Sequence, residues 1–199
     1  MHRRKLWLLA GVALAALALA ANGSARVSGP ERASAGGTLV FGAEQGGGPD
    51  WCLNLILDVD CNAFWNVMFQ TPVVRGAFLF TPKFTYQNDL ISRFTFQRNP
   101  QRITYYIHKN ARWSDGVQVT GKDWKFTWQT AINPKYKDHI DPLGWQDIRS
   151  VVGNGKVVKV TYKRNFAGWK NLFGYILPRH ALQGTEMLTV WNDYICNPK

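Results

Sequence analysis

One stretch in the middle of the chain constrains the fold most, because a strand, a tight turn and a helix follow one another in it. Residues 102–109 alternate apolar and polar side chains with the period of two that a strand shows. Ser114-Asp115-Gly116 then has the composition of a turn. Thr120, three residues before Asp123, forms a capping box at the start of a helix, and Asn133-Pro134 ends that helix.

The predicted helix has one broad apolar face. Its members recur at helical spacing, so we expect them to pack in the core and not to form a cofactor site: Trp124, Thr127, Trp128, Ala131 and Ile132. His108, at the end of the strand, is expected at the surface. We interpret the joint between strand and helix as structural, and its defining residues are Trp113, Asp115, Gly116, Thr120 and Asp123.

Two more elements are predicted downstream. Residues 148–152 and 157–162 read as a β-hairpin, because Gly153-Asn154-Gly155 between them favours a tight turn. The apolar residues between 169 and 176 are spaced as in a short helix, which Pro178 closes.

The first 25 residues predict a secretory signal peptide. Residues 2–5 are basic, residues 6–19 are apolar, and small residues at Ala18 and Ala20 supply a cleavage pattern. The alternative, a membrane anchor, needs about 20 apolar residues, and this run is shorter. We therefore expect an exported protein, periplasmic or on the extracellular face of the cytoplasmic membrane.

The folded part is expected to begin after a flexible leader at residues 26–37. A short apolar run at 38–43 indicates a strand buried on both faces, which opens the domain at 38–199. The loop that follows starts with Glu44, Gln45 and Gly46, and loops at strand ends often carry binding groups.

Three cysteines in an exported chain favour pairing. Cys52 and Cys61 lie close enough in sequence for a local disulfide, which would stabilise the fold by about 2–3 kcal/mol. A metal site is the alternative, but no histidine lies near and the spacing matches no zinc pattern. Cys196 is left without an assigned partner.

The formal net charge of +11 falls to about +8 once the three basic residues of the predicted signal peptide are removed. Such a balance suits nucleic acid or an anionic envelope surface. The cations are scattered singly among aromatic residues, however, with no basic run or nucleic-acid motif. We favour solvated charge and expect no nucleic-acid partner.

Catalytic and cofactor motifs do not emerge from the sequence. It contains no zinc-protease, serine-hydrolase or phosphate-loop pattern, and the one loop with metal-ligating residue types, at 138–141, holds a single histidine. We therefore expect no metal and no cofactor. An aromatic-rich exported scaffold favours binding over turnover, so we predict that the protein is not an enzyme.

Residues 106–116, together with Val119-Thr120 and Asp123, resemble the signature of extracellular solute-binding protein family 5, the peptide, dipeptide and nickel binders of ABC importers. Residues 37–40, the hairpin at 148–162 and residues 176–182 add to the resemblance. Two positions depart from the pattern, since Gln118 replaces the usual proline and Gly121 the usual alanine. Gly121 should weaken the first turn of the helix slightly.

The resemblance implies an α/β, two-lobed fold of the periplasmic-binding-protein type, of which this chain would hold only the first lobe in part and a small β-rich subdomain at about 76–177. It also implies a monomer that captures a peptide or other small solute and delivers it to permease subunits in the membrane. Glu44, Gln45 and Gly46 would then line the ligand cleft. We accordingly expect an amino-terminal fragment. The alternatives left open are a secreted hydrolase with its catalytic residues downstream and a basic envelope-binding module.

Overall fold

The computed structural model describes residues 54, 57, 68, 70 and 73–190. The predicted signal peptide, leader, first strand and cysteines lie outside these residues. No helix within the described part is long and apolar enough to cross a membrane. The boundaries predicted for the small subdomain, about 76–177, stay a prediction.

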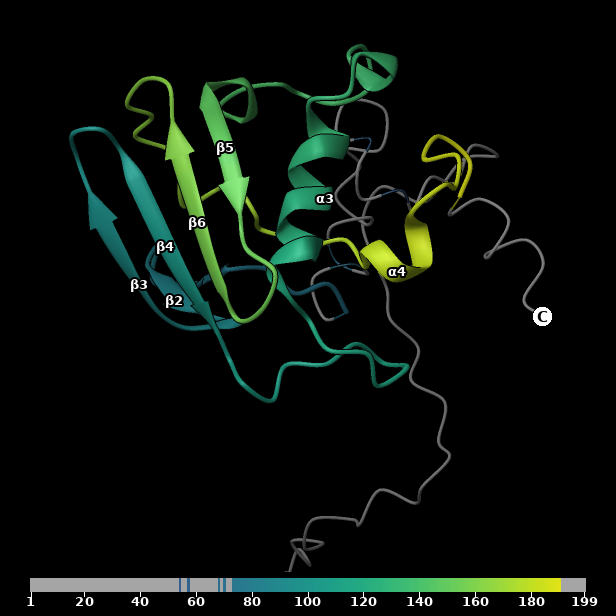
Figure 1. The fold of residues 1–199 in the computed structure, drawn as a ribbon, viewed down its shortest axis with the longest axis horizontal. Helices are drawn as coiled ribbons and strands as arrows, with labels where there is room; N and C mark the ends of the chain where they lie inside the picture. The colour runs from purple at the N-terminus through teal and green to yellow at the C-terminus, as the bar shows by residue number, and fades with distance from the viewer. Residues whose placement is uncertain (1–53, 55–56, 58–67, 69, 71–72, 191–199) are drawn as a thin grey trace, which may run out of the picture. The chain divides into compact units, whose positions relative to one another are not determined.

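The centre of the fold is a four-stranded antiparallel sheet (Figure 1). Its strands lie in the order β3-β4-β6-β5, so that the hairpin made by the last two strands adds to β4 through β6. Their bounds are β3 (Ile91–Gln97), β4 (Arg102–Ile107), β5 (Ile148–Val152) and β6 (Val157–Tyr162). The predicted strand at 102–109 and the predicted hairpin are thus confirmed.

One face of this sheet is apolar and buried. On β4 the side chains of Ile103, Tyr105 and Ile107 are almost inaccessible, whereas their neighbours in sequence are half-buried. On β6 the buried side chains again alternate with more accessible ones. The alternation predicts the strand but leaves both of its faces half-buried, whereas in the structure the face of Ile103, Tyr105 and Ile107 is fully buried because the hydrophobic core covers it.

Helix α3 (Gly121–Ala131) contributes Trp124 to the hydrophobic core that covers this face, and lies beside β5 in Figure 1. It begins where predicted, since Thr120 is its N-cap and the Thr120–Asp123 capping box is present. Trp124 is fully buried. Ile132 was expected in the core but is 39% exposed, because the helix ends at Ala131 and the backbone of Ile132 has left the helical conformation.

A two-stranded ribbon, β1 (Phe78–Phe80) and β2 (Tyr86–Asn88), precedes the sheet. Two backbone hydrogen bonds fix the residues just before β1. The amide N of Ala77 donates to the carbonyl of Phe173, and the amide N of Leu90 donates to the carbonyl of Gly76. The side chain of Phe78, on β1, is buried in the hydrophobic core.

The prediction of a helix at 169–176 is wrong. This segment is a series of turns, and Phe173 has a positive φ of 59°, which no helix accommodates. Its apolar side chains are nevertheless core residues, and Phe173 lies between Tyr105, Trp124 and Trp145. The other elements within the described residues are the 3-10 helices η1 (Pro134–Tyr136) and η2 (Trp145–Asp147) and the short helix α4 (Arg179–Leu182).

Candidate functional site

The turn between β4 and α3 is closed by its own side chains and backbone. Asp115 accepts a hydrogen bond from the amide N of Val117 at 3.0 Å, and Gly116 has a φ of 88°, a conformation that glycine adopts without strain. Arg112 donates from Nη1 to the carbonyl of Gly116 at 2.9 Å. The turn is therefore an ordered loop and can position the groups around it.

His180 of α4 contacts this turn. Its Nε2 lies 2.6 Å from Oδ2 of Asp115, and the ring of Trp113 lies beside it at 6.2 Å between centroids. The amide N of Val117 and, next, His180 hold the pKa of Asp115 below its ordinary value. The pair joins two segments that are 65 residues apart in sequence.

Two polar side chains of α3 hold the segment that leads into α4. Asp123 completes the capping box, where it accepts from the amide N of Thr120 at 2.7 Å, and it also accepts from the amide N of Arg179 at 3.0 Å. Thr127 accepts from the amide N of Leu177 at 2.9 Å. Both side chains are buried, so the start of α4 has a fixed place beside the first turns of α3.

Lys156, just after the hairpin turn, holds the loop between β4 and α3. Its Nζ donates to the carbonyls of Ala111 and Val119, at 2.9 and 2.8 Å. Partial burial is the main cause that lowers its pKa, and the positive charge of Arg112 adds to the effect.

These contacts frame a polar hollow of about 500 Å³ between α3, the β5–β6 turn and α4. Three cations line it, Lys122, Lys125 and Arg179, together with side-chain amides and the hydroxyl of Thr130. No carboxylate lines the hollow, and none of the three cations has an ion-pair partner among the residues that the structure describes. We call this hollow the cationic groove.

The cationic groove is suited to negatively charged groups. Lysine and arginine donate charge-assisted hydrogen bonds to carboxylates and phosphates, and the side-chain amides can donate to the same oxygens. Lys122 and Lys125 stand in the first turns of α3, where the helix dipole favours anions over cations. Their placement therefore raises the local positive potential instead of stabilising the helix.

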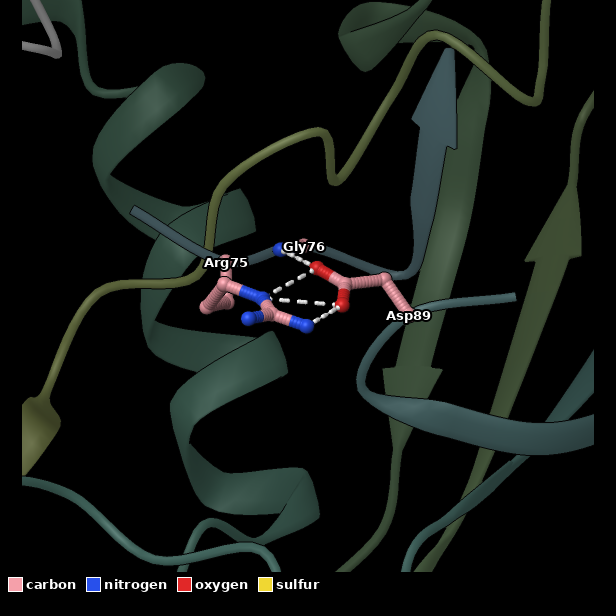
Figure 2. A network of polar contacts seen from close by, with 3 residues as sticks. All are labelled: Arg75, Gly76 and Asp89. Carbon is pink, nitrogen blue, oxygen red and sulfur yellow. Dashed lines mark hydrogen bonds and ion pairs between the residues drawn. The ribbon is translucent and has the colours of Figure 1, made fainter. Parts of the chain in front are cut away.

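A second hollow, of about 350 Å³, lies beside the β1–β2 ribbon. Its walls are mainly apolar, from Phe78, Leu79 and Phe80, and Lys170 lies within 5.8 Å of the ring centroid of Phe78. Asp89 lies at its edge and accepts hydrogen bonds from the guanidinium of Arg75, with Nε at 2.8 Å, as Figure 2 shows. The amide N of Gly76 donates to the same carboxylate at 3.3 Å.

The Asp89 carboxylate in this second hollow already accepts hydrogen bonds from Arg75 and Gly76. Its contacts with Arg75 raise the pKa of that guanidinium, and they join the segment before β1 to the segment after β2. Gly76 allows close packing here, since a Cβ at this position would lie 2.2 Å from the carbonyl oxygen of Gly174. The Arg75–Asp89 contact is therefore a support of the fold, and the cationic groove is the better candidate site.

The binding residues predicted from the sequence, Glu44, Gln45 and Gly46, lie outside the described residues, as do Cys52 and Cys61 of the predicted disulfide. The cationic groove was not predicted. Its cations come from two segments more than fifty residues apart, and only the pair of lysines at the start of a helix gave a local signal.

Comparison with known proteins defines the class of protein. Residues 85–191 match the sequence profile of the bacterial extracellular solute-binding proteins, family 5 (middle region). The solved structures that resemble the chain are two-lobed periplasmic binding proteins, to part of which this α/β chain corresponds. Because the profile covers more than half of its length, the chain belongs to solute-binding protein family 5.

Among solved structures, the periplasmic EDTA-binding protein EppA has a TM-score of 0.63 at 28% identity, over 72% of this chain and 28% of EppA. The oligopeptide-binding protein AppA from Bacillus subtilis, solved with a nonapeptide, has a TM-score of 0.54 at 18% identity over 61% of this chain and 25% of AppA, a likeness of fold alone.

Two curated relatives match shorter stretches. The probable monoacyl phosphatidylinositol tetramannoside-binding protein LpqW of Mycobacterium tuberculosis (strain ATCC 25618 / H37Rv) is 30% identical over 96 residues, which are 47% of this chain and 15% of LpqW. The oligopeptide-binding protein OppA of Lactococcus lactis subsp. lactis (strain IL1403) is 27% identical over 115 residues, 47% of this chain and 18% of OppA. The chain thus spans less than a fifth of the length of either relative.

Proposed function

We propose that this chain belongs to the substrate-binding component of an ABC importer, which captures an extracytoplasmic solute, a peptide, and delivers it to permease subunits in the membrane. The family match over residues 85–191 carries the proposal. The similarity to the oligopeptide-binding protein OppA supports a peptide as the solute. Export directed by the signal peptide at residues 1–25 and action as a monomer belong to the same proposal.

Within this proposal, the cationic groove receives a carboxylate of the solute. Lys122, Lys125 and Arg179 supply positive charge without a competing acid on the groove wall. The Asp123 and Thr127 contacts fix the segment from which Arg179 projects, so less conformational entropy is lost on binding. Glu44, Gln45 and Gly46 remain the proposed contacts from the loop after the first strand.

The role of the groove can be tested with one peptide prepared in two forms, with a free carboxyl terminus and as the carboxyl-terminal amide. In an NMR titration of the 199-residue chain, we expect the free acid to cause larger chemical-shift changes than the amide at the same peptide concentration. The Lys125→Gln/Arg179→Gln variant should lose this preference for the free acid. Lys83→Gln/Lys137→Gln is the matched control, because it removes the same charge from exposed residues outside the groove. Equal loss in both variants would show that overall charge, not the groove, recognises the carboxylate.

The importer role itself requires a second α/β lobe, since this fold closes on its solute by hinge motion. Sequencing the coding region beyond Lys199 is therefore the most direct test, and the absence of any second lobe there would contradict the proposal. With the complete protein, calorimetry should give saturable peptide binding without product. Release of product would instead favour the alternative of a secreted hydrolase.

A further inference from the structure

The face of the four-stranded sheet that points away from the core is basic. The strand register places Arg93, Tyr106 and Val157 side by side on β3, β4 and β6. Lys159 follows on β6 opposite Val152 of β5, and Arg102 lies at the other end of β4. We call these six residues the basic sheet face.

No strand of this sheet contains an aspartate or a glutamate. The three cations of the basic sheet face therefore have no acidic partner on it, and none forms an ion pair elsewhere within the described part of the chain. Arg93 instead lies over the ring of Tyr106, with its guanidinium carbon 3.4 Å from the ring centroid, a contact that leaves its charge unneutralised.

The same face exposes apolar side chains among its cations. Val152 is 64% exposed and Val157 is 48% exposed, on positions of the pleat where a solvated sheet usually carries polar residues. Cations mixed with small apolar side chains fit the boundary of an anionic bilayer, where phosphates meet acyl chains. A protein interface would need aromatic anchors that fill pockets, and the described face offers none beyond Tyr106, which Arg93 covers.

From this placement we propose that the basic sheet face docks on the headgroups of an anionic phospholipid membrane, with Arg93, Arg102 and Lys159 against the phosphates and the two valines at the acyl boundary. This role is separate from solute capture, because the face is the side of the sheet opposite to the core into which α3 packs. Docking would hold a binding protein beside a membrane without a permanent anchor.

Vesicle co-sedimentation of the 199-residue chain tests the proposal, with phosphatidylcholine vesicles that either contain or lack phosphatidylglycerol. Each cation near an anionic surface strengthens partitioning roughly fivefold, so Arg93→Gln/Lys159→Gln should weaken binding to anionic vesicles roughly 20- to 30-fold. Salt at about 0.5 M, where the Debye length is only a few ångström, should abolish the difference between the two vesicle types.

The matched control is Lys83→Gln/Lys137→Gln, which removes the same net charge from exposed loop positions. Its binding should stay close to that of the unmodified chain, because Lys83 and Lys137 lie in turns outside the basic sheet face. An equal fall in both variants would overturn the proposal. So would a single-stranded oligonucleotide that binds more tightly than the vesicles and is weakened by the same substitutions, since the face would then serve nucleic acid.

A folding control accompanies the experiment. Arg93 covers Tyr106, so its loss can disturb the sheet, which thermal melting followed by circular dichroism would reveal. In that case Lys159→Gln against Lys83→Gln gives the same comparison with one charge each. A fivefold weaker partitioning confined to Lys159→Gln supports the proposal, and equal partitioning of the two variants contradicts it.

Discussion

Thr127 shows how one buried hydroxyl can position a distant segment. Its Oγ1 donates to the carbonyl of Asp123 within α3 and accepts from the amide N of Leu177, fifty residues later. A buried backbone N–H that lacks a partner costs about 1–3 kcal/mol, so a polar residue on the apolar face of α3 stabilises the molecule. The sequence placed Thr127 on that face but gave no indication of its partner.

We therefore expect Thr127→Val to lower the free energy of unfolding by about 1–3 kcal/mol, although valine has the same shape. The loss arises because the amide of Leu177 stays buried without an acceptor. Urea denaturation measures the change. Thr95→Val is the control, since Thr95 is exposed on β3 and its substitution should alter stability by less than about 0.5 kcal/mol. Equal effects at both positions would refute the assigned role.

Asp115 gives a pH-dependent prediction. Its pKa lies below the ordinary 3.8, so its charged form stabilises the turn above that pH, and this stabilisation is lost as the pH falls through the lowered pKa. Carboxyl-carbon NMR should show this titration. His180→Gln should raise the pKa of Asp115 only part of the way, because the larger cause, the amide N of Val117, remains. His108→Gln, at an exposed position outside this contact, should leave the titration unchanged.

At the scale of elements, Gly121 has a different role from the one its sequence context suggests. It stands in the first turn of α3, where glycine weakens a helix. The structure explains its presence, since a Cβ on Gly121 would lie 2.6 Å from the backbone of Gly153 in the hairpin turn. The amide N of Gly121 also donates to the carbonyl of Gly155 at 2.8 Å. Helix and hairpin thus approach through their backbones at this point.

The expected result of Gly121→Ala is a loss of stability of about 1–3 kcal/mol, because overpacking against Gly153 outweighs the gain of up to about 1 kcal/mol in helix propensity. Chemical denaturation of the variant and the unmodified chain gives this difference. Gly155→Ala is a matched control, because a Cβ there meets nothing within 4 Å. Stabilisation by Gly121→Ala would mean that propensity, not packing, decides at this position.

The elements that local rules determine could be predicted from the sequence. Alternation identified β4, the Thr120–Asp123 pair identified the start of α3, and Asn154-Gly155 identified the hairpin. The turns at 169–176 could not, since their apolar spacing imitates a helix while Phe173 takes a positive φ to reach the core. The cationic groove could not either, because only the tertiary contacts of Asp123 and Thr127 bring Arg179 to Lys122 and Lys125.

At the scale of the whole molecule, the groove and the basic sheet face are two separate surfaces with three cations each. The groove lies between α3, the β5–β6 turn and α4, whereas the basic sheet face is the far side of the sheet. If both proposals hold, a solute and a membrane surface do not compete for the same residues. The fold around both surfaces corresponds to 28% of the EppA chain, so a solute held in this groove would meet contacts from one side.

A solute that is contacted from one side only should bind weakly. Tight small-molecule sites bury roughly 70–90% of the ligand surface, which in this fold requires closure between two lobes. We expect the 199-residue chain to bind peptides with a Kd above about 1 μM in calorimetry, because the matched part corresponds to 28% of the EppA chain and the proposed closure needs a second lobe. A chain extended through a second lobe should bind the same peptides more tightly. Submicromolar affinity in the 199-residue chain would show that the groove alone encloses the solute, and the proposed dependence on closure would then be wrong.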